Sequence, residues 1–178
     1  PETQNEFYRI LDPRFRRMPK DLVLPFLPKK LYSTRYVEMT PKQAKAYETM
    51  AEQMVAMTDG GPIIALDNLS KLTRLSQFAS AMAEVDENGD VKLTEPSNKV
   101  DALVELLEEL GQEPAVVFSE SRQVIELAAA RLTKLGITYT MIVGGQTPDQ
   151  REKAKDDFQA GKVRTILCTI KAAKEGIT

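Results

Sequence analysis

Three segments in the second half of the chain place hydroxyl-bearing, glycine or lysine residues directly after a short apolar run. They are Ser119-Glu120-Ser121, Gly144-Gly145-Gln146-Thr147 and Thr169-Ile170-Lys171. Where a strand meets a helix, hydroxyls and backbone N–H groups can bind a phosphate group of a nucleic acid. We therefore predict phosphate contacts by Ser119 and by the Gly144–Thr147 turn, whose glycines permit unusual backbone angles and exposed amides.

These residues also have purely structural interpretations. Ser119 fits the N-cap of a helix expected at 121–135, and Thr147 followed by Pro148 is a typical helix start. Thr169 and Lys171 fit an ordinary loop with a solvated lysine, and Arg151 fits a surface or ion-pair residue. The sequence leaves both interpretations open.

The N-terminal part of the chain is basic, although the chain as a whole has a net charge of −2. Between residues 9 and 35 only Asp12 and Asp21 oppose eight basic residues, which leaves a local charge of +6. This asymmetry fits a contact with phosphates or with acidic groups of a neighbouring domain, and equally a solvated surface. The eight basic residues are Arg9, Arg14, Arg16, Arg17, Lys20, Lys29, Lys30 and Arg35.

The composition excludes several kinds of catalytic site. The chain has no histidine and one cysteine, Cys168, so zinc sites, histidine-based triads and internal disulfides are excluded. Neither the G-x-x-x-x-G-K-[ST] phosphate loop nor a G-x-G-x-x-G motif occurs. We therefore assign the chain no catalytic residue and no metal site. No apolar run approaches the roughly 18 residues of a membrane span, so no membrane contact is expected.

From Ser97 onward, helices and short apolar strands alternate. The expected helices cover 98–110, 121–135 and 147–158, and the expected strands 115–118, 137–143 and 163–168. This alternation predicts an α/β fold with a parallel sheet and right-handed crossovers. Ligands of such sheets bind at the carboxyl ends of the strands, where the three segments described above would meet. Cys168 is expected to be a small buried residue of the last strand.

Residues 1–96 are predicted to form a mainly helical arm and linker with a small β-hairpin, and 97–178 a second domain. Prolines at 13, 19, 25 and 28 divide residues 1–30 into short helical turns, and alternation predicts a strand at Leu31–Met39. A helix should run from Thr40-Pro41 to about Asp59–Pro62, and another over Leu66–Ala83. Asn88-Gly89 predicts an exposed hairpin within Glu84–Leu93.

The two helices of this region should each bury one apolar stripe, since their apolar residues recur every three or four positions. In the first helix the stripe comprises Ala44, Tyr47, Ala51, Met54 and Val55, and in the second Leu69, Leu72, Leu75, Phe78, Ala79 and Met82.

Several motifs occur together in an order that resembles a known family. They are Phe15–Asp21 with its double arginine, Leu27-Pro28-Lys29-Lys30, Met39-Thr40-Pro41-Lys42-Gln43 with Tyr47, Leu72–Leu75, Asn98-Lys99, Ala115–Ser119 with Arg122, Gly144–Pro148 with Arg151 and Phe158, and Ile166–Thr178. The pattern is similar to the second RecA-like lobe of superfamily 2 helicases. More narrowly, it resembles the Swi/Snf-type DNA-dependent ATPases, including their annealing-helicase relatives, over nearly the whole chain.

The resemblance implies a RecA-like parallel sheet flanked by helices, and a role for particular residues. Nucleic-acid contacts would come from Ser119, Arg122, Gly144, Gly145, Thr147, Thr169 and Lys171. Coupling to the ATP cleft between lobes would come from Arg16, Arg17, Arg151 and Gly176. The chain departs from the family where Ala173 and Lys174 replace paired glycines that allow a close backbone approach.

Whole enzymes of this family bind ATP and Mg²⁺ between two lobes and translocate on double-stranded DNA. By this resemblance the chain is a fragment that supplies the second lobe, with the N-terminal RecA-like lobe of the same polypeptide as its partner. Alone it should bind no cofactor and hydrolyse no ATP. Without that partner, the few apolar residues of 172–178 cannot offset the entropy of ordering, so we expect the chain after Thr169 to be mobile or held only by a neighbouring molecule.

A stand-alone α/β module that binds nucleic acid or protein through the basic 9–35 segment is the alternative function. A flavodoxin-like or receiver-like domain is disfavoured, because no acidic cluster or flavin-loop signature follows the first strand. The expected location is the cytoplasm, with the nucleoid of a bacterial or phage-infected host, or the nucleus if the source is eukaryotic.

Overall fold

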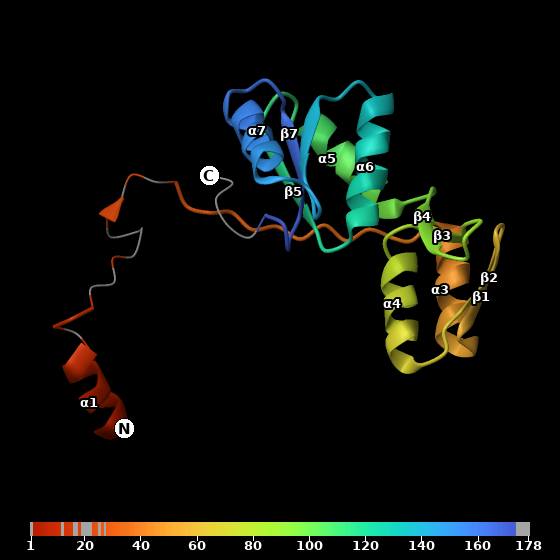
Figure 1. Ribbon diagram of the computed structural model, residues 1–178, viewed down its shortest axis with the longest axis horizontal. Coiled ribbons are helices and arrows are strands. Elements are labelled where there is room, and N and C mark those ends of the chain that lie inside the picture. The colour runs from red at the N-terminus through yellow and green to blue at the C-terminus, as the bar shows by residue number, and fades with distance from the viewer. Residues whose placement is uncertain are drawn as a thin grey trace. The chain divides into compact units, whose positions relative to one another are not determined.

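The computed structural model describes residues 2–11, 13–15, 18, 23–24, 26 and 28–173. The chain divides into two compact units, residues 1–36 and 37–178. In the first unit, helix α1 (Glu2–Leu11) ends before Pro13, because proline cannot continue a helix (Figure 1). The backbone N–H groups of Arg14 and Phe15 both donate to the Leu11 carbonyl at 2.8 Å, which satisfies the helix end.

Residues 28–40 form no helix or strand, so the predicted strand at Leu31–Met39 is wrong. A strand is stable only when a neighbour pairs with its backbone groups, and no strand within the described residues pairs with this segment. Its aromatic residues Tyr32 and Tyr36 are accordingly 87% and 93% exposed. Alternation of apolar and polar residues shows that a segment can form a strand. Hydrogen bonding to a neighbouring strand decides whether it does.

Helix α3 (Pro41–Gln53) starts where the sequence predicts, with Thr40 as N-cap and Pro41 in the first turn. It ends earlier than predicted, because Met54 adopts a left-handed conformation with φ 59°. Strands β1 (Val55–Thr58) and β2 (Gly61–Ile64) follow and form an antiparallel hairpin. The Asp59–Pro62 signal therefore belongs to a hairpin turn and not to the helix end. The buried positions of α3 are Gln43, Ala46 and Met50, so the predicted stripe is displaced by about one residue.

Helix α4 (Asn68–Phe78) begins after the N-cap Asp67 and is shorter than the predicted helix 66–83. Its predicted apolar stripe faces outward in part. Leu69 and Leu72 are 75% and 64% exposed, whereas Phe78 is fully buried.

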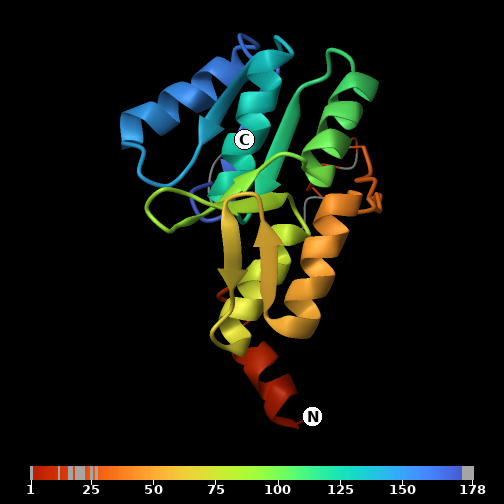
Figure 2. The same ribbon diagram turned by 90° about the vertical axis from the view of Figure 1, so that its right-hand side faces the viewer.

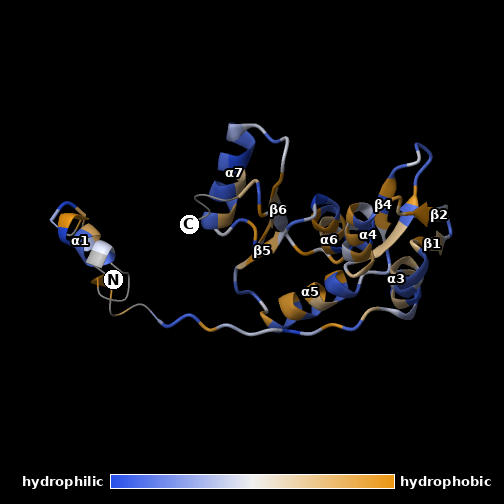
Figure 3. Ribbon diagram, turned by 90° about the horizontal axis from the view of Figure 1, so that it is seen from below, coloured by the Kyte–Doolittle hydropathy of each residue, from blue (hydrophilic) through white to orange (hydrophobic). Residues whose placement is uncertain are grey.

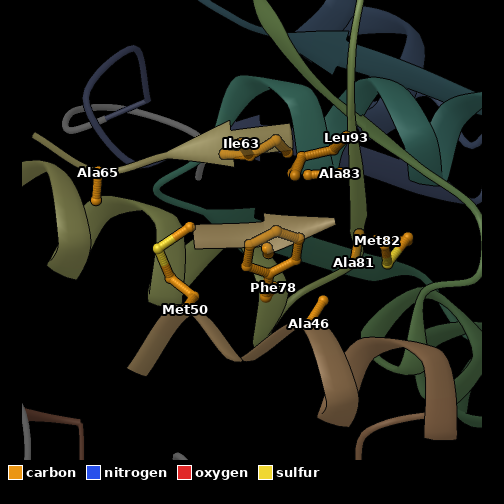
Figure 4. Packing of buried hydrophobic residues seen from close by; sticks show 10 residues of the cluster. Ala46, Met50, Ile63, Ala65, Phe78, Ala81, Met82, Ala83 and Leu93 are labelled. Carbon is orange, nitrogen blue, oxygen red and sulfur yellow. The ribbon is translucent and has the colours of Figure 1, made fainter. Parts of the chain in front are cut away.

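Strands β3 (Met82–Val85) and β4 (Val91–Thr94) form the hairpin predicted around Asn88-Gly89. Gly89 has φ +84°, the backbone conformation that such a turn requires. The hairpin is not an exposed excursion, because Met82, Ala83 and Leu93 are buried. They pack with Met50, Ile63 and Phe78 in the first hydrophobic core, so one face of the hairpin is buried (Figure 4).

The second half of the chain has the alternating order that the sequence predicts. It comprises α5 (Asn98–Glu109), β5 (Ala115–Ser119), α6 (Arg122–Lys134), β6 (Tyr139–Ile142), α7 (Pro148–Gln159) and β7 (Thr165–Thr169). The strands form a parallel sheet in the order β5-β7-β6. The α/β class and the parallel sheet flanked by helices are thus confirmed.

Helices cover both faces of this sheet, as Figures 1 and 2 show. On one face α5 and α6 bury residues such as Val100, Ile125 and Leu132 against Leu167. On the other face Ala154 of α7 packs against Ile166. Figure 3 shows that α7 is largely hydrophilic, which agrees with the single residue it buries fully. Within the described residues, no helix has the length and apolarity needed to cross a membrane.

A buried glutamine joins the helix–hairpin region to the start of α5. The Gln43 amide nitrogen donates to the Phe78 carbonyl at 2.9 Å and to Asn98 Oδ1 at 3.0 Å. Its Oε1 accepts the backbone N–H of Asn98 at 3.2 Å. Ser97 adds a second link through its hydroxyl, which donates to the Ser80 carbonyl at 2.7 Å. The predicted division at residues 96 and 97 therefore lies where two regions of one compact unit are hydrogen-bonded to each other.

Candidate nucleic-acid interface

The carboxyl ends of β5 and β7 lie side by side in the sheet. Ser119 and Thr169 are paired in register, and the backbone N–H of Ile170 donates to the Ser119 carbonyl at 3.0 Å. Because all strands are parallel, the end of β6 and its following loop lie at the same edge. The structure thus brings the three segments singled out in the sequence to one edge of the sheet.

Ser119 does not cap helix α6. Its hydroxyl accepts the backbone N–H of Ser121 at 3.1 Å, which closes the turn between strand and helix. Ser121 is the N-cap and accepts the Val124 N–H at 3.4 Å. The structural interpretation of Ser119 as N-cap is therefore wrong. The helix begins one position later than predicted, and sequence alone did not show which serine caps it.

Arg122 connects the loop after β5 to the loop after β6. Its Nη1 donates to the Gly144 carbonyl at 3.2 Å, and its Nε pairs with Glu126 Oε1 at 2.7 Å. Glu126 lies one helical turn further along α6. The guanidinium is therefore engaged by the protein itself, through an ion pair with Glu126 and a longer hydrogen bond to the glycine loop.

The glycine loop, residues 143–147, is held by side-chain-to-backbone bonds. Gln146 Oε1 accepts the Val143 N–H at 2.9 Å, and its amide nitrogen donates to the Met141 carbonyl at 3.1 Å. Gly145 has φ +86°, which favours glycine. Thr147 caps α7 by accepting the Gln150 N–H at 3.3 Å, as the sequence predicts.

Backbone donors remain available in this loop. Within the described residues, the N–H groups of Gly144, Gly145 and Gln146 make no hydrogen bond, and both glycines are exposed. Successive free N–H groups form a concave anion-binding surface in many proteins. The sequence missed Gln146 as part of this site, although an amide side chain beside two glycines is the feature that would have indicated it.

The first residues after β7 form a hydrogen-bonded turn. The Thr169 carbonyl accepts the N–H groups of Ala172 and Ala173 at 3.0 and 3.1 Å. Ala173 is buried with Ile166 and Cys168 in the core beneath α7. These bonds and the buried methyl group of Ala173 place residues 170–173 against the sheet, and mobility of the chain after Thr169 stays a prediction. Thr169 is buried and Lys171 is exposed.

The residues predicted to couple the lobe to an ATP cleft are only partly described. Arg16, Arg17 and Gly176 lie outside the described residues. Arg151 lies in the first turns of α7, half-buried, and its Nε is buried without a hydrogen-bond partner among the described residues.

This edge of the sheet carries charged residues of both signs and a buried thiol. Lys171 and Arg122 are the basic residues, with Glu120 and Glu126 near them in sequence. Burial raises the pKa of the Cys168 thiol to about 11, so this group is neutral at pH 7. No group of acidic or cysteine side chains in the described parts of the chain could hold a metal ion. The site can therefore bind phosphate through N–H groups, hydroxyls and a lysine.

A groove borders this edge. It has a volume of about 410 Å³ and is lined by Lys99, Phe118, Ser119, Ser121, Val124 and Ile170, among others. Its walls come from α5, β5 and α6, so Ser119 lies on a concave surface and not on a convex one.

Comparison with known proteins agrees with this architecture. Residues 98–178 match the family described as helicase conserved C-terminal domain. The chain is 33% identical over 88 residues to DEAD-box ATP-dependent RNA helicase 21 of Oryza sativa subsp. japonica, an alignment that covers 49% of the chain and 12% of that protein. It is 25% identical over 186 residues to an uncharacterised ATP-dependent helicase of Mycoplasma pneumoniae, which covers 99% of the chain and 17% of the relative. The chain thus spans less than a fifth of the length of either relative.

Among solved structures, the C-terminal domain of the SWI2/SNF2 ATPase of Sulfolobus solfataricus has the same fold. The two share 20% sequence identity with a TM-score of 0.58, over 81% of this chain and 65% of that one. This similarity extends beyond residues 98–178 into the helix–hairpin region. Residues 98–178 of the chain therefore match the helicase conserved C-terminal domain, and the chain has the fold of the C-terminal domain of a SWI2/SNF2 ATPase.

Proposed function

We propose that the chain is the second motor lobe of a nucleic-acid-dependent ATPase and binds the sugar–phosphate backbone at the carboxyl edge of its sheet. The observation that carries this proposal is that the N–H groups of residues 144–146 make no hydrogen bond to any described residue, in a loop tied by Arg122 to the segment after β5. Ser119 and Thr169 are paired beside that segment, and Lys171 adds a positive charge. Hydroxyl, amide and lysine donors are the groups that contact phosphates without reading bases.

We propose double-stranded DNA as the nucleic acid. The fold shared with a SWI2/SNF2 ATPase over 81% of the chain supports this choice. Several relatives, however, are named as RNA helicases, and contacts to phosphate alone distinguish the two poorly. The choice therefore needs a direct comparison of the two nucleic acids.

ATP and Mg²⁺ would bind between this lobe and an N-terminal RecA-like lobe of the same polypeptide. The residues described here do not form a magnesium site, since they include no acidic cluster, and the sequence has no phosphate loop. The other lobe would therefore supply the acidic ligands and the phosphate loop. Arg151, half-buried in the first turns of α7, is the described residue of this chain that the resemblance assigns to a contact across the cleft.

The test is a titration of labelled DNA duplex and RNA duplex of equal length with the 178-residue chain, at several salt concentrations. We expect weak binding that falls steeply with salt, because the contacts are to phosphates. The proposed choice of double-stranded DNA predicts that the DNA duplex binds more tightly than the RNA duplex. Preference for RNA would overturn the choice of DNA. Tight, sequence-dependent binding at physiological salt would overturn the motor-lobe proposal in favour of a dedicated binding module.

A further inference from the structure

We propose that Gln146 is a positioning residue for phosphate binding: its side-chain amide fixes the Gly144–Gly145 turn so that the free N–H groups point outward. This inference rests on the proposed function of the glycine loop. Gln146 would not touch the nucleic acid through its amide, because that amide is engaged by the backbone of β6 and the residue that follows it.

The Gln146 amide lies beside β6, at the unpaired side of the sheet. In the order β5-β7-β6, strand β6 has no further strand beside it among the described residues. The Gln146 amide accepts from Val143 and donates to Met141, at 2.9 and 3.1 Å, as a neighbouring strand would. The Gln146 side chain thus holds the turn against the end of β6 through its hydrogen bonds to Val143 and Met141.

Arg122 fixes the direction of the peptide group between Gly144 and Gly145. Arg122 Nη1 donates to the Gly144 carbonyl at 3.2 Å. In a planar trans peptide the C=O and the next N–H point in opposite directions, so the Gly145 N–H must point away from Arg122. A Cβ on Gly145 would lie 3.9 Å from Arg122 Nη1, so the arginine lies beside the turn without filling it.

Together these hydrogen bonds hold the turn at three places. Gln146 holds its two ends, and Arg122 holds its middle at the Gly144 carbonyl. Free N–H groups bind an anion best when they are already oriented, because binding then costs little conformational entropy. A merely edge-capping glutamine would stabilise the fold and leave affinity unchanged. A positioning glutamine changes affinity for phosphate at nearly constant stability of the sheet.

The chain offers a matched control. Gln123 performs the same edge-capping role on β4, where its Oε1 accepts the Leu93 N–H at 2.8 Å and its amide nitrogen donates to the Val91 carbonyl at 3.2 Å. The comparison is therefore Gln146→Met against Gln123→Met, since each replacement keeps the length of the side chain and removes both hydrogen bonds. Thermal unfolding of both variants reports the cost of losing an edge cap.

The binding readouts are amide NMR shifts of residues 144–146 during titration with inorganic phosphate, and DNA-duplex affinity as a function of salt. We expect Gln146→Met to weaken DNA binding roughly three- to tenfold, the effect of one net hydrogen bond or slightly more. The slope of log affinity against log salt should stay unchanged, because no positive charge is lost. Gln123→Met should bind like the parent chain.

Each outcome has one meaning. If Gln146→Met binds phosphate and DNA as the parent does, the positioning role is wrong although the proposed function stands. The same holds if both glutamine variants lose affinity in proportion to lost stability. If the parent chain binds DNA without any shift at residues 144–146, the loop is not the phosphate site, and both this inference and the proposed interface fail. If the parent chain binds no nucleic acid at all, the proposed function itself fails.

Discussion

At the scale of single residues, the candidate interface depends on side chains that hold the backbone in place. Ser119 accepts the Ser121 N–H, and Arg122 and Gln146 hold the glycine loop. Local signals predicted where these loops lie, because a glycine pair or Thr-Pro acts on its own neighbours. They did not predict the Arg122–Gly144 contact, which joins positions 22 apart and depends on how α6 packs beside β6.

Lys171 is the exposed basic residue that should contact a phosphate directly. Replacing it in Lys171→Ala should weaken DNA binding and lower the salt slope by roughly 0.9, the value for one neutralised phosphate of B-DNA. Fluorescence anisotropy at a series of salt concentrations measures both quantities. Lys134→Ala is the control, because Lys134 lies in the last turn of α6, near the opposite edge of the sheet. Equal slopes of log affinity against log salt concentration for the two variants would show that Lys171 does not contact a phosphate.

Cys168 should be inert although it precedes the site. Burial raises the pKa of its thiol to about 11, from an ordinary value of 9.0. The thiolate is then roughly a hundredfold scarcer in the folded chain than in the unfolded one at pH 8, so labelling by a thiolate-specific reagent should be slower by at least about that factor. The raised pKa favours the folded chain below pH 9, and this contribution is lost as the pH rises from about 9 through 11. Rapid labelling of the native chain would show that β7 opens readily.

At the scale of elements, the alternating half of the chain was predicted well and the first half less well. Each helix of the second half has its own cap and buries one face, so local patterns suffice. The strand at Leu31–Met39 failed because pairing is non-local, and helix α3 was predicted too long because nothing in the sequence marks Met54 as left-handed. The hairpin β1–β2 was not predicted, because its turn residues Asp59-Gly60 also fit the end of a helix.

Gln43 provides the test of how the helix–hairpin region is attached to α5. The variant Gln43→Ala would leave the Asn98 side chain and the Phe78 carbonyl without their buried partner. An unsatisfied buried polar group costs about 1–3 kcal/mol, so the free energy of unfolding should fall by at least about that amount. Chemical denaturation measures it, with Gln112→Ala at an exposed position as the control, expected within about 0.5 kcal/mol of the parent chain. A change as small as that of the control would mean that the buried network contributes nothing to the junction.

At the scale of the whole molecule, we propose that the chain is one of the two lobes of a nucleic-acid-dependent ATPase. We propose the carboxyl edge of the sheet as a phosphate-binding surface, but the groups that cradle and polarise a γ-phosphate in related ATPases are not in the sequence. Positioning and charge neutralisation by lysine, arginine and Mg²⁺ perform that chemistry. The lobe would therefore move the nucleic acid only in concert with a second lobe.

The 178-residue chain should consequently show no ATP hydrolysis above background, with or without DNA or RNA. A coupled phosphate-release assay at saturating ATP and Mg²⁺ measures this directly. Turnover that rises with added nucleic acid, and that disappears in a Gly145→Asp variant, would show that the chain is a complete catalyst.

The most direct test of the whole account is amide hydrogen exchange of the chain with and without a short DNA duplex at low salt. We predict protection confined to 119–122, 144–147 and 169–171, and its loss when the salt concentration is raised, since the contacts are to phosphates. Protection confined to the basic 9–35 segment, with these three loops unchanged, would contradict the account and favour a binding module that uses its N-terminal arm.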